Sequence, residues 1–212
     1  CGFGNQPANP LQIAECTSEA AITSSTNIIG KALYQFEDIY ESWSMQLARL
    51  FNADAQVQCL SGIGMCKNGI GLQPHSPYNM TYFVDRTLPF TEPVGSNMWN
   101  YSQFRPDVLV INLGTNDYIA STGPTAPGYQ EFQDHYVRFV HHIMGNYDAA
   151  KTKVLLACGP MTSRQCPYVE AAGKLLVQDF HLGYVNVSLG CVAGVCGGCA
   201  GHPTQNGDTH MV

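Results

Sequence analysis

The chain has 212 residues, 10 Lys and Arg against 16 Asp and Glu, and a formal net charge of −6. Only 12% of the residues are charged while 45% are apolar, which excludes an extended disordered chain. The negative charge argues against a nucleic-acid partner, because such proteins need Lys and Arg to neutralise phosphates. No apolar run approaches the roughly 20 residues of a membrane helix, so no membrane partner is expected. We predict a single domain over residues 1–212, and we interpret the start at Cys1 instead of Met as a processed or trimmed form.

Nine cysteines are many for a domain of this size, and they favour an oxidising compartment. Their close spacing predicts short disulfide loops, and the alternative is a set of buried free thiols. The predicted pairs are Cys59 with Cys66, Cys158 with Cys166, and Cys191 with Cys196 or Cys199. The C-x-x-C spacing of Cys196 and Cys199 also fits zinc or redox chemistry. A structural zinc site would need a second pair at similar spacing, and the sequence has none.

Three N-x-S/T sequons, at Asn79, Asn100 and Asn186, are candidate glycosylation sites. Together with the cysteines they favour a secreted, extracellular protein.

The first half of the chain predicts a helix, a strand and two long loops. Residues 1–34 are small and polar and are typical of a loop. Apolar residues at helical spacing predict an amphipathic helix over residues 35–51. The alternation in residues 55–60 predicts a strand, and residues 67–104, rich in Gly, Pro and Asn, a long surface loop.

The second half alternates strands and helices. Residues 108–113 are a continuous apolar run, as expected for a strand at the centre of a parallel sheet. A helical stripe over 132–144, a strand over 154–157, a helix over 169–176 and a strand over 184–187 follow. This alternation predicts an α/β fold with a mostly parallel sheet, in which ligands lie beyond the carboxyl ends of the strands.

Three short motifs carry side chains or backbone groups suited to chemistry. Asn116 follows the strand at 108–113, where its amide can donate to an oxyanion, although an ordinary Asx turn would explain it too. Gly62 follows the strand at 55–60, and its N–H is a second candidate donor, although Gly in that place is most often only a turn. His202, fixed by Pro203, is a candidate general base, with an unremarkable surface histidine as the alternative.

The order and spacing of these motifs resemble the SGNH (GDSL-type) hydrolase superfamily, and most closely the family-2 carbohydrate esterases, which remove acetyl groups from polysaccharides. Residues 106–117 (Pro-Asp-Val-Leu-Val-Ile-Asn-Leu-Gly-Thr-Asn-Asp) look like the third conserved block of the superfamily, and residues 61–64 (Ser-Gly-Ile-Gly) like the second. His202-Pro203 with Gly207 and Met211 looks like the fifth.

The resemblance implies a flavodoxin-like three-layer α/β/α sandwich and an acyl-serine esterase that works without a metal or an organic cofactor. The Gly62 N–H and the Asn116 amide would form the oxyanion hole, and His202 would activate a serine as one half of a Ser–His dyad. Trp99 would line the side that binds the sugar, with core packing as its alternative role. The chain departs from the superfamily at Cys199, where an Asp is usual, and at Asp208, where this branch often has His.

The nucleophile is a further departure, because the G-D-S-x-T block that carries it is not in the sequence. Ser18 is an alternative nucleophile that lacks the apolar strand and the Gly of such a turn. The resemblance therefore implies a domain without its first, central strand and its last helix. In the superfamily this first strand lies between the strands that correspond to residues 55–60 and 108–113. We expect its place to be filled by an N-terminal segment, or by a strand or a disulfide-linked segment of another chain.

Three functions follow as hypotheses. The first is a secreted esterase acting on O-acetyl groups of a polysaccharide or glycan. The second is a catalytically inactive SGNH-fold protein with a structural role in an extracellular filament or matrix. The third, a Cys-rich metal or redox protein, lacks a second C-x-x-C pair.

Overall fold

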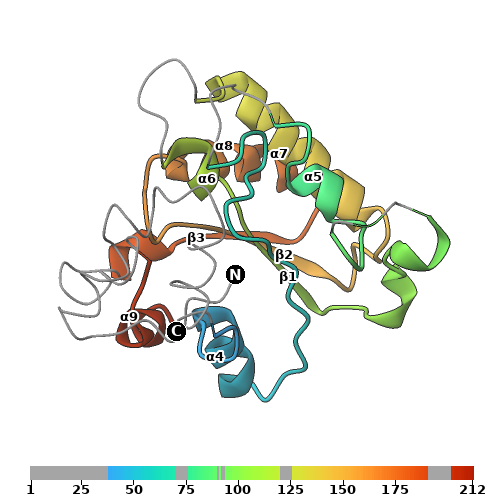
Figure 1. The fold of residues 1–212 in the computed structure, drawn as a ribbon, viewed down its shortest axis with the longest axis horizontal. Coiled ribbons are helices and arrows are strands. Elements are labelled where there is room, and N and C mark those ends of the chain that lie inside the picture. The colour runs from blue at the N-terminus through green and yellow to red at the C-terminus, as the bar shows by residue number, and fades with distance from the viewer. Residues whose placement is uncertain (1–37, 70–75, 90, 92–93, 120–125, 191–201) are drawn as a thin grey trace. The chain divides into compact units, whose positions relative to one another are not determined.

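The computed structural model describes residues 38–69, 76–89, 91, 94–119, 126–190 and 202–212. The chain divides into two compact units, residues 1–59 with 187–212 and residues 60–186, and each is described by itself. The elements of the described part (Figure 1) are, in chain order, α4 (Trp43–Leu50), α5 (Met80–Phe83), η2 (Gly95–Asn97), η3 (Tyr101–Gln103), β1 (Val108–Asn112), α6 (Thr115–Tyr118), α7 (Tyr129–Met144), β2 (Lys153–Cys158), α8 (Cys166–Leu176), β3 (Leu182–Asn186), η4 (Val187–Gly190) and α9 (Gln205–His210). No helix of this part is both long and apolar enough to cross a membrane.

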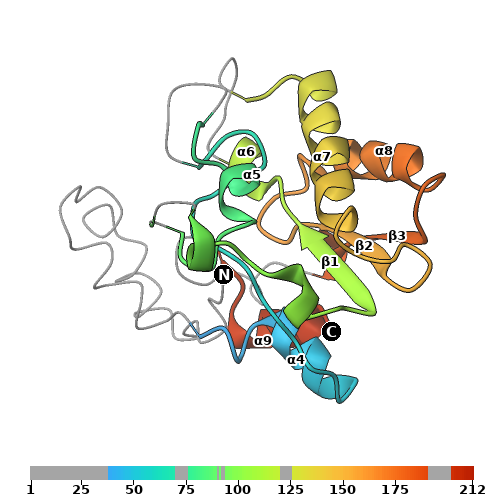
Figure 2. The ribbon, with the colours of Figure 1, turned by 90° about the vertical axis from the view of Figure 1, so that its right-hand side faces the viewer.

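The unit of residues 60–186 is built on a parallel sheet with the order β1-β2-β3. The register aligns Leu109 with Val154, and Val154 in turn with Leu182. Figure 2 shows α7 and α8 on the same side of this sheet, and α8 packs closely enough that a Cβ on Gly173 would lie 3.3 Å from Leu182 Cδ2. The predicted α/β fold with a parallel sheet is confirmed.

The α7 helix supplies much of the core of this unit. The six apolar residues of the predicted stripe are all buried in it: Phe132, Tyr136, Phe139, Val140, Ile143 and Met144. The Tyr136 hydroxyl donates to the Ile111 carbonyl of β1 at 3.3 Å. The predicted helices at 132–144 and 169–176 are confirmed, although Leu175 is 50% exposed and not part of the buried stripe of α8.

The strand at 108–113 was expected at the centre of the sheet, but among the described residues β1 is an edge strand that pairs only with β2. Its burial agrees with that place, because Val108 is 51% exposed and Val110 38% exposed. Val185 of β3 is 38% exposed as well. These three valines lie on the sheet face away from Leu156, which is buried.

In the other unit, the predicted helix over 35–51 is confirmed only from Trp43 to Leu50, as α4. The segment before α4 is a turn, because the Asp38 carboxylate accepts from the Tyr40 N–H at 3.0 Å and such local bonds compete with a helix. Ser42 is extended, with φ −69° and ψ 154°. The same unit contains α9, whose Thr209 hydroxyl bonds Gln46 of α4 at 3.0 Å.

The predicted strand at 55–60 is wrong. Residues 53–60 form neither helix nor strand, and 55–59 are exposed, Val57 by 40%. Alternation of apolar and polar residues favours a strand only where a neighbouring strand pairs with it. None of the described strands pairs with this segment.

The predicted cysteine pairs divide into one confirmed and one wrong. Cys158 and Cys166 form a disulfide between β2 and α8. Cys59 and Cys66 are free, because Cys66 is buried in the core while Cys59 is exposed. The other five cysteines lie outside the described residues.

Candidate functional site

A tight turn over residues 60–69 carries the first predicted oxyanion donor, Gly62. The Ile63 N–H donates to the Leu60 carbonyl at 3.2 Å, and the Gly69 N–H closes the turn on the Gly62 carbonyl at 2.8 Å. Gly62 itself is half-buried, and its N–H makes no backbone hydrogen bond with the described residues. The turn therefore presents one backbone donor that its own hydrogen bonds do not use.

The second predicted donor, Asn116, lies in α6, directly after the turn at Gly114 that connects β1 to this helix. Gly114 makes this turn, with φ +110°, a conformation that disfavours any side chain. There is also no room for one, since a Cβ would lie 2.8 Å from Phe132 Cζ and 3.0 Å from Gln165 Cβ. The chain thus passes from β1 into α6 pressed against α7 and α8, which fixes the direction of the following residues.

The structure brings these two turns together. The Asn116 Nδ2 donates to the Ile63 carbonyl at 3.0 Å. A Cβ on Gly69 would lie 2.7 Å from Asn116 Oδ1, so the turn and the amide are in close contact. An amide nitrogen has two N–H donors, and the bond to Ile63 uses one of them. The role of Gly62 and Asn116 in catalysis stays a prediction.

Asp117, next to Asn116, was part of the sequence motif but was given no role there. Its carboxyl group is fully buried and accepts from the backbone N–H groups of Met65, Cys66 and Lys67. Burial raises the pKa of Asp117, and these hydrogen bonds oppose the rise. Burial also raises the pKa of the Cys66 thiol, which makes this free cysteine a poor nucleophile.

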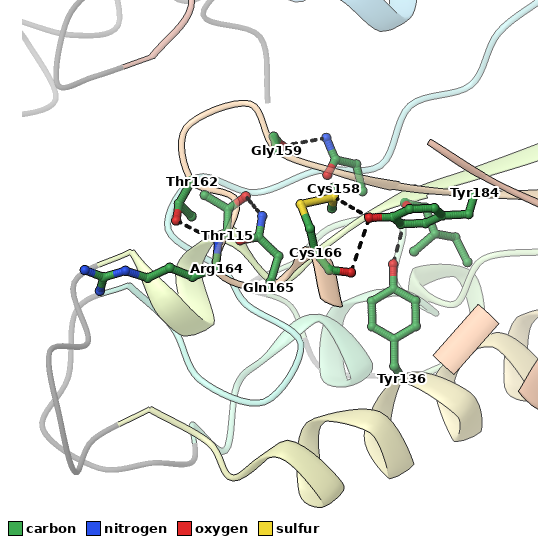
Figure 3. The surroundings of a disulfide bond; sticks show 11 residues. Thr115, Tyr136, Cys158, Gly159, Thr162, Arg164, Gln165, Cys166 and Tyr184 are labelled. Carbon is green, nitrogen blue, oxygen red and sulfur yellow. Dashed lines mark hydrogen bonds between the residues drawn. A yellow bond between two sulfur atoms is a disulfide. The ribbon is translucent and has the colours of Figure 1, made fainter. Parts of the chain in front are cut away.

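The Cys158–Cys166 disulfide and the residues around it support the β1–α6 turn from α8 (Figure 3). Gln165, fully buried beside the disulfide, donates from Nε2 to the Thr115 hydroxyl at 3.3 Å. The Tyr184 hydroxyl lies 3.1 Å from Cys158 Sγ and donates to the Cys166 carbonyl at 3.2 Å. Neither Gln165 nor Tyr184 stands out in the sequence, because their contacts depend on the packing of α8.

His202, the predicted general base, lies just before α9 and is half-buried. Pro203 and Thr204 after it are buried, and the Thr204 side chain caps α9 by accepting from the Gly207 N–H at 3.1 Å. This segment belongs to the other compact unit, so action of His202 together with Gly62 and Asn116 stays a prediction.

Trp99, the predicted sugar-binding residue, is half-buried in the segment before β1. Its backbone N–H donates to the Asp85 carbonyl at 2.7 Å, and its side chain bonds Tyr147, which follows α7. These are packing contacts within the unit. The role in substrate binding stays a prediction.

The three sequons occupy different surroundings. Asn79 caps α5, and its Nδ2 points to the buried Cys66 carbonyl at 3.5 Å. Asn100 is exposed, and its Oδ1 accepts from the Ser102 N–H and hydroxyl. These two bonds do not involve Nδ2, the atom that would carry a glycan. Asn186 is half-buried at the end of β3. Of the three, Asn100 is the most accessible for a glycan, and occupancy stays a prediction.

Two further predictions lie outside the described residues, Ser18 as an alternative nucleophile and the Cys196–Cys199 pair. Within the described ranges, no group of three or more His, Cys, Asp and Glu side chains gathers in a way that would hold a metal ion.

No family model matches the chain. The chain is 33% identical over 125 residues to the cellulase/esterase CelE of Acetivibrio thermocellus, which covers 59% of the chain and 14% of that protein. It is 24% identical over 185 residues to an acetylxylan esterase/glucomannan deacetylase of Cellvibrio japonicus, over 81% of the chain and 49% of that protein. Among solved structures, a family two carbohydrate esterase from Clostridium thermocellum in complex with cellohexaose matches with a TM-score of 0.71 and 25% identity, over 84% of the chain and 52% of the other. The chain thus spans about half the length of these relatives, or less.

Proposed function

Because the chain is a relative of the SGNH-type family-2 carbohydrate esterases, we propose that it is part of a secreted esterase that removes O-acetyl groups from a polysaccharide or glycan. The observation that carries this proposal is the close contact between the Gly62 turn and Asn116 at the carboxyl end of β1. That is the edge of a parallel sheet where ligands bind. The named relatives support the substrate class, since one is an acetylxylan esterase and glucomannan deacetylase.

In the proposed reaction a serine hydroxyl attacks the acetyl carbonyl, and the His202 imidazole takes the hydroxyl proton. The negative charge on the carbonyl oxygen is stabilised by the Gly62 N–H and by the second N–H of Asn116. The bond to the sugar oxygen then breaks, and His202 returns the proton to that oxygen. Water releases acetate from the acetyl-serine by the same steps. The serine lies on the G-D-S-x-T block implied by the family, which is not among the 212 residues.

We further propose the three-layer sandwich of the family. Val108, Val110 and Val185 make one face of the sheet apolar and partly exposed, which supports a second layer over that face. The edge position of β1 among the described strands supports pairing of β1 with a further strand, from a segment outside this sequence or from another chain. The disulfide of Cys158 and Cys166 supports secretion.

The test is hydrolysis of p-nitrophenyl acetate and of acetylated xylan by the natural full-length protein. We expect His202→Ala to lower kcat by at least about 100-fold and Asn116→Ala by about 100-fold or more. His210→Ala, an exposed histidine of α9, is the matched control and should retain full activity. A wild-type protein with no activity on either ester would instead support the inactive structural protein. Equal activity of the two histidine variants would remove His202 from the mechanism.

A further inference from the structure

The carboxyl group of Asp117 lies at the centre of the turn that carries Gly62. The Met65 N–H donates to Oδ2 at 2.8 Å, and the N–H groups of Cys66 and Lys67 donate to Oδ1 at 2.7 and 2.8 Å. Three successive backbone donors therefore converge on one carboxyl group, an arrangement known as a nest. All of these groups are buried, where a backbone N–H without an acceptor is costly.

The turn is shaped to admit this carboxyl group. A Cβ on Gly64 would lie 2.6 Å from Asp117 Oδ2 and 1.8 Å from the Lys67 carbonyl oxygen, so only Gly fits there. The Gly64 N–H donates to Asn68 Oδ1 at 3.1 Å, and the Gly64 carbonyl accepts from Met80 at 2.9 Å. These bonds hold Gly64, but the N–H groups of residues 65–67 are held by Asp117.

Asp117 and Asn116 are consecutive residues of α6, yet they bind the turn at two points. Asn116 holds the Ile63 carbonyl at 3.0 Å, and Asp117 holds the three N–H groups that follow Gly64. Two neighbouring side chains therefore fix both the position and the rotation of the backbone between Gly62 and Lys67. The Gly62 N–H and the Asn116 amide are thereby held at a fixed distance and direction from each other.

We propose that Asp117 is a positioning residue that sets the distance and direction between the two oxyanion donors, Gly62 N–H and Asn116 Nδ2. The proposal rests on the proposed esterase function, because it assigns Asp117 a part in the same site. Asp117 touches neither substrate nor nucleophile and acts through the turn. Loss of the carboxyl group should therefore weaken stabilisation of the transition state more than binding of the substrate.

The test is Asp117→Asn in the natural full-length protein. The amide has the shape of the carboxyl group but only one acceptor oxygen, so at least one of the three N–H groups loses its partner. We expect kcat for p-nitrophenyl acetate to fall by about 100-fold with KM changed by less than about threefold, the pattern of an interaction made in the transition state. Amide hydrogen exchange should become faster at residues 65–67 and unchanged in β2.

Leu176→Ala is the control for a merely structural role. Leu176 is fully buried at the last residue of α8, the end of the helix remote from the carboxyl ends of the strands. This variant should lose stability yet keep kcat in the folded protein. The proposal is overturned if Asp117→Asn keeps slow exchange at residues 65–67, or if it keeps kcat. Should the wild type show no esterase activity, the proposed function fails, and hydrogen exchange alone decides whether Asp117 holds the turn.

Discussion

Asp117 and Asp208, one in each compact unit, are both buried carboxyl groups, 0% and 3% exposed, but they differ in how many donors they meet. Asp117 accepts from three backbone N–H groups at 2.7 to 2.8 Å. Within the described part of its unit, Asp208 accepts from one donor, the Trp43 N–H, at 3.2 Å. Burial raises the pKa of Asp208 to about 7, against this single opposing hydrogen bond. A buried carboxyl group on which several backbone donors converge thus anchors the backbone around it, whereas one that meets a single donor anchors little. Because burial raises the pKa of both groups, each makes the stability of its unit depend on pH.

The largest expected effect is the loss of stability caused by Gly64→Ala in the unit that contains Asp117. The new Cβ would lie 1.8 Å from the Lys67 carbonyl oxygen and 2.6 Å from Asp117 Oδ2, so the turn must open. We expect the free energy of unfolding of this unit to fall by about 3 kcal/mol. The chain has two tryptophans, Trp43 in one unit and Trp99 in the other, so urea unfolding followed by Trp99 fluorescence in a Trp43→Phe background reports on this unit.

Gly128→Ala is the matched control for this prediction. A Cβ on Gly128, which precedes α7, meets nothing within 4 Å. This substitution should change the unfolding free energy by less than about 0.5 kcal/mol. If Gly64→Ala were equally mild, the turn would be loose enough to give way, and Asp117 would not be held as tightly as its three short bonds indicate.

The next effect is a change of the free energy of unfolding with pH, caused by the ionisation of Asp208. The unfolded pKa of Asp is about 3.9 and the folded pKa is about 7, so between these values the folded state binds more protons than the unfolded state. The free energy of unfolding therefore decreases as pH rises through this window and is lowest above pH 7. The loss is on the order of 1–4 kcal/mol, since one pKa unit is worth about 1.4 kcal/mol.

Asp208→Asn should remove this pH dependence. The amide oxygen keeps an acceptor for the Trp43 N–H, and the amide carries no charge to bury. At pH 8 the variant should be more stable than the wild type, and at pH 4 the two should be nearly equal. Urea unfolding followed by Trp43 fluorescence in a Trp99→Phe background measures this at each pH. Parallel curves for the two proteins would mean that Asp208 ionises in the folded state without cost.

Local periodicity predicted the helices far better than the strand at 55–60. The α7 stripe from Phe132 to Met144 was recognisable because every apolar residue in it faces one core. The segment around Val57 has a strand-like alternation, but whether it forms a strand depends on a partner that the alternation does not reveal. The pairing of Cys59 with Cys66 failed for the same reason, since sequence spacing does not show that one is buried and the other exposed.

The candidate site was predicted from residues that follow two predicted strands, of which the structure forms only one. Asn116 comes after β1, whereas the Gly62 turn comes after residues 55–60, which form no strand, and the structure still brings the two together. Asp117 was missed as a functional residue because its three partners are 50 to 52 residues away in the sequence. Its local signal, an Asp after an Asn in a turn, is also that of an ordinary Asx turn. Only the folded turn shows which of the two neighbours donates and which accepts.

The smallest expected effect concerns Thr204, which lies in the same unit as Asp208. Thr204 caps α9, the helix that carries Asp208, by accepting from the Gly207 N–H at 3.1 Å. Thr204→Ala should lower the unfolding free energy of this unit by about 1 kcal/mol, measured by Trp43 fluorescence at pH 8, and Thr204→Ser should restore most of it because it keeps the hydroxyl. In this unit the neutral cap would then stabilise the helix while the buried carboxyl group weakens it above pH 7. If Thr204→Ala had no effect in the Asp208→Asn background, the cap and the carboxyl group would be coupled, and α9 would be held by both together.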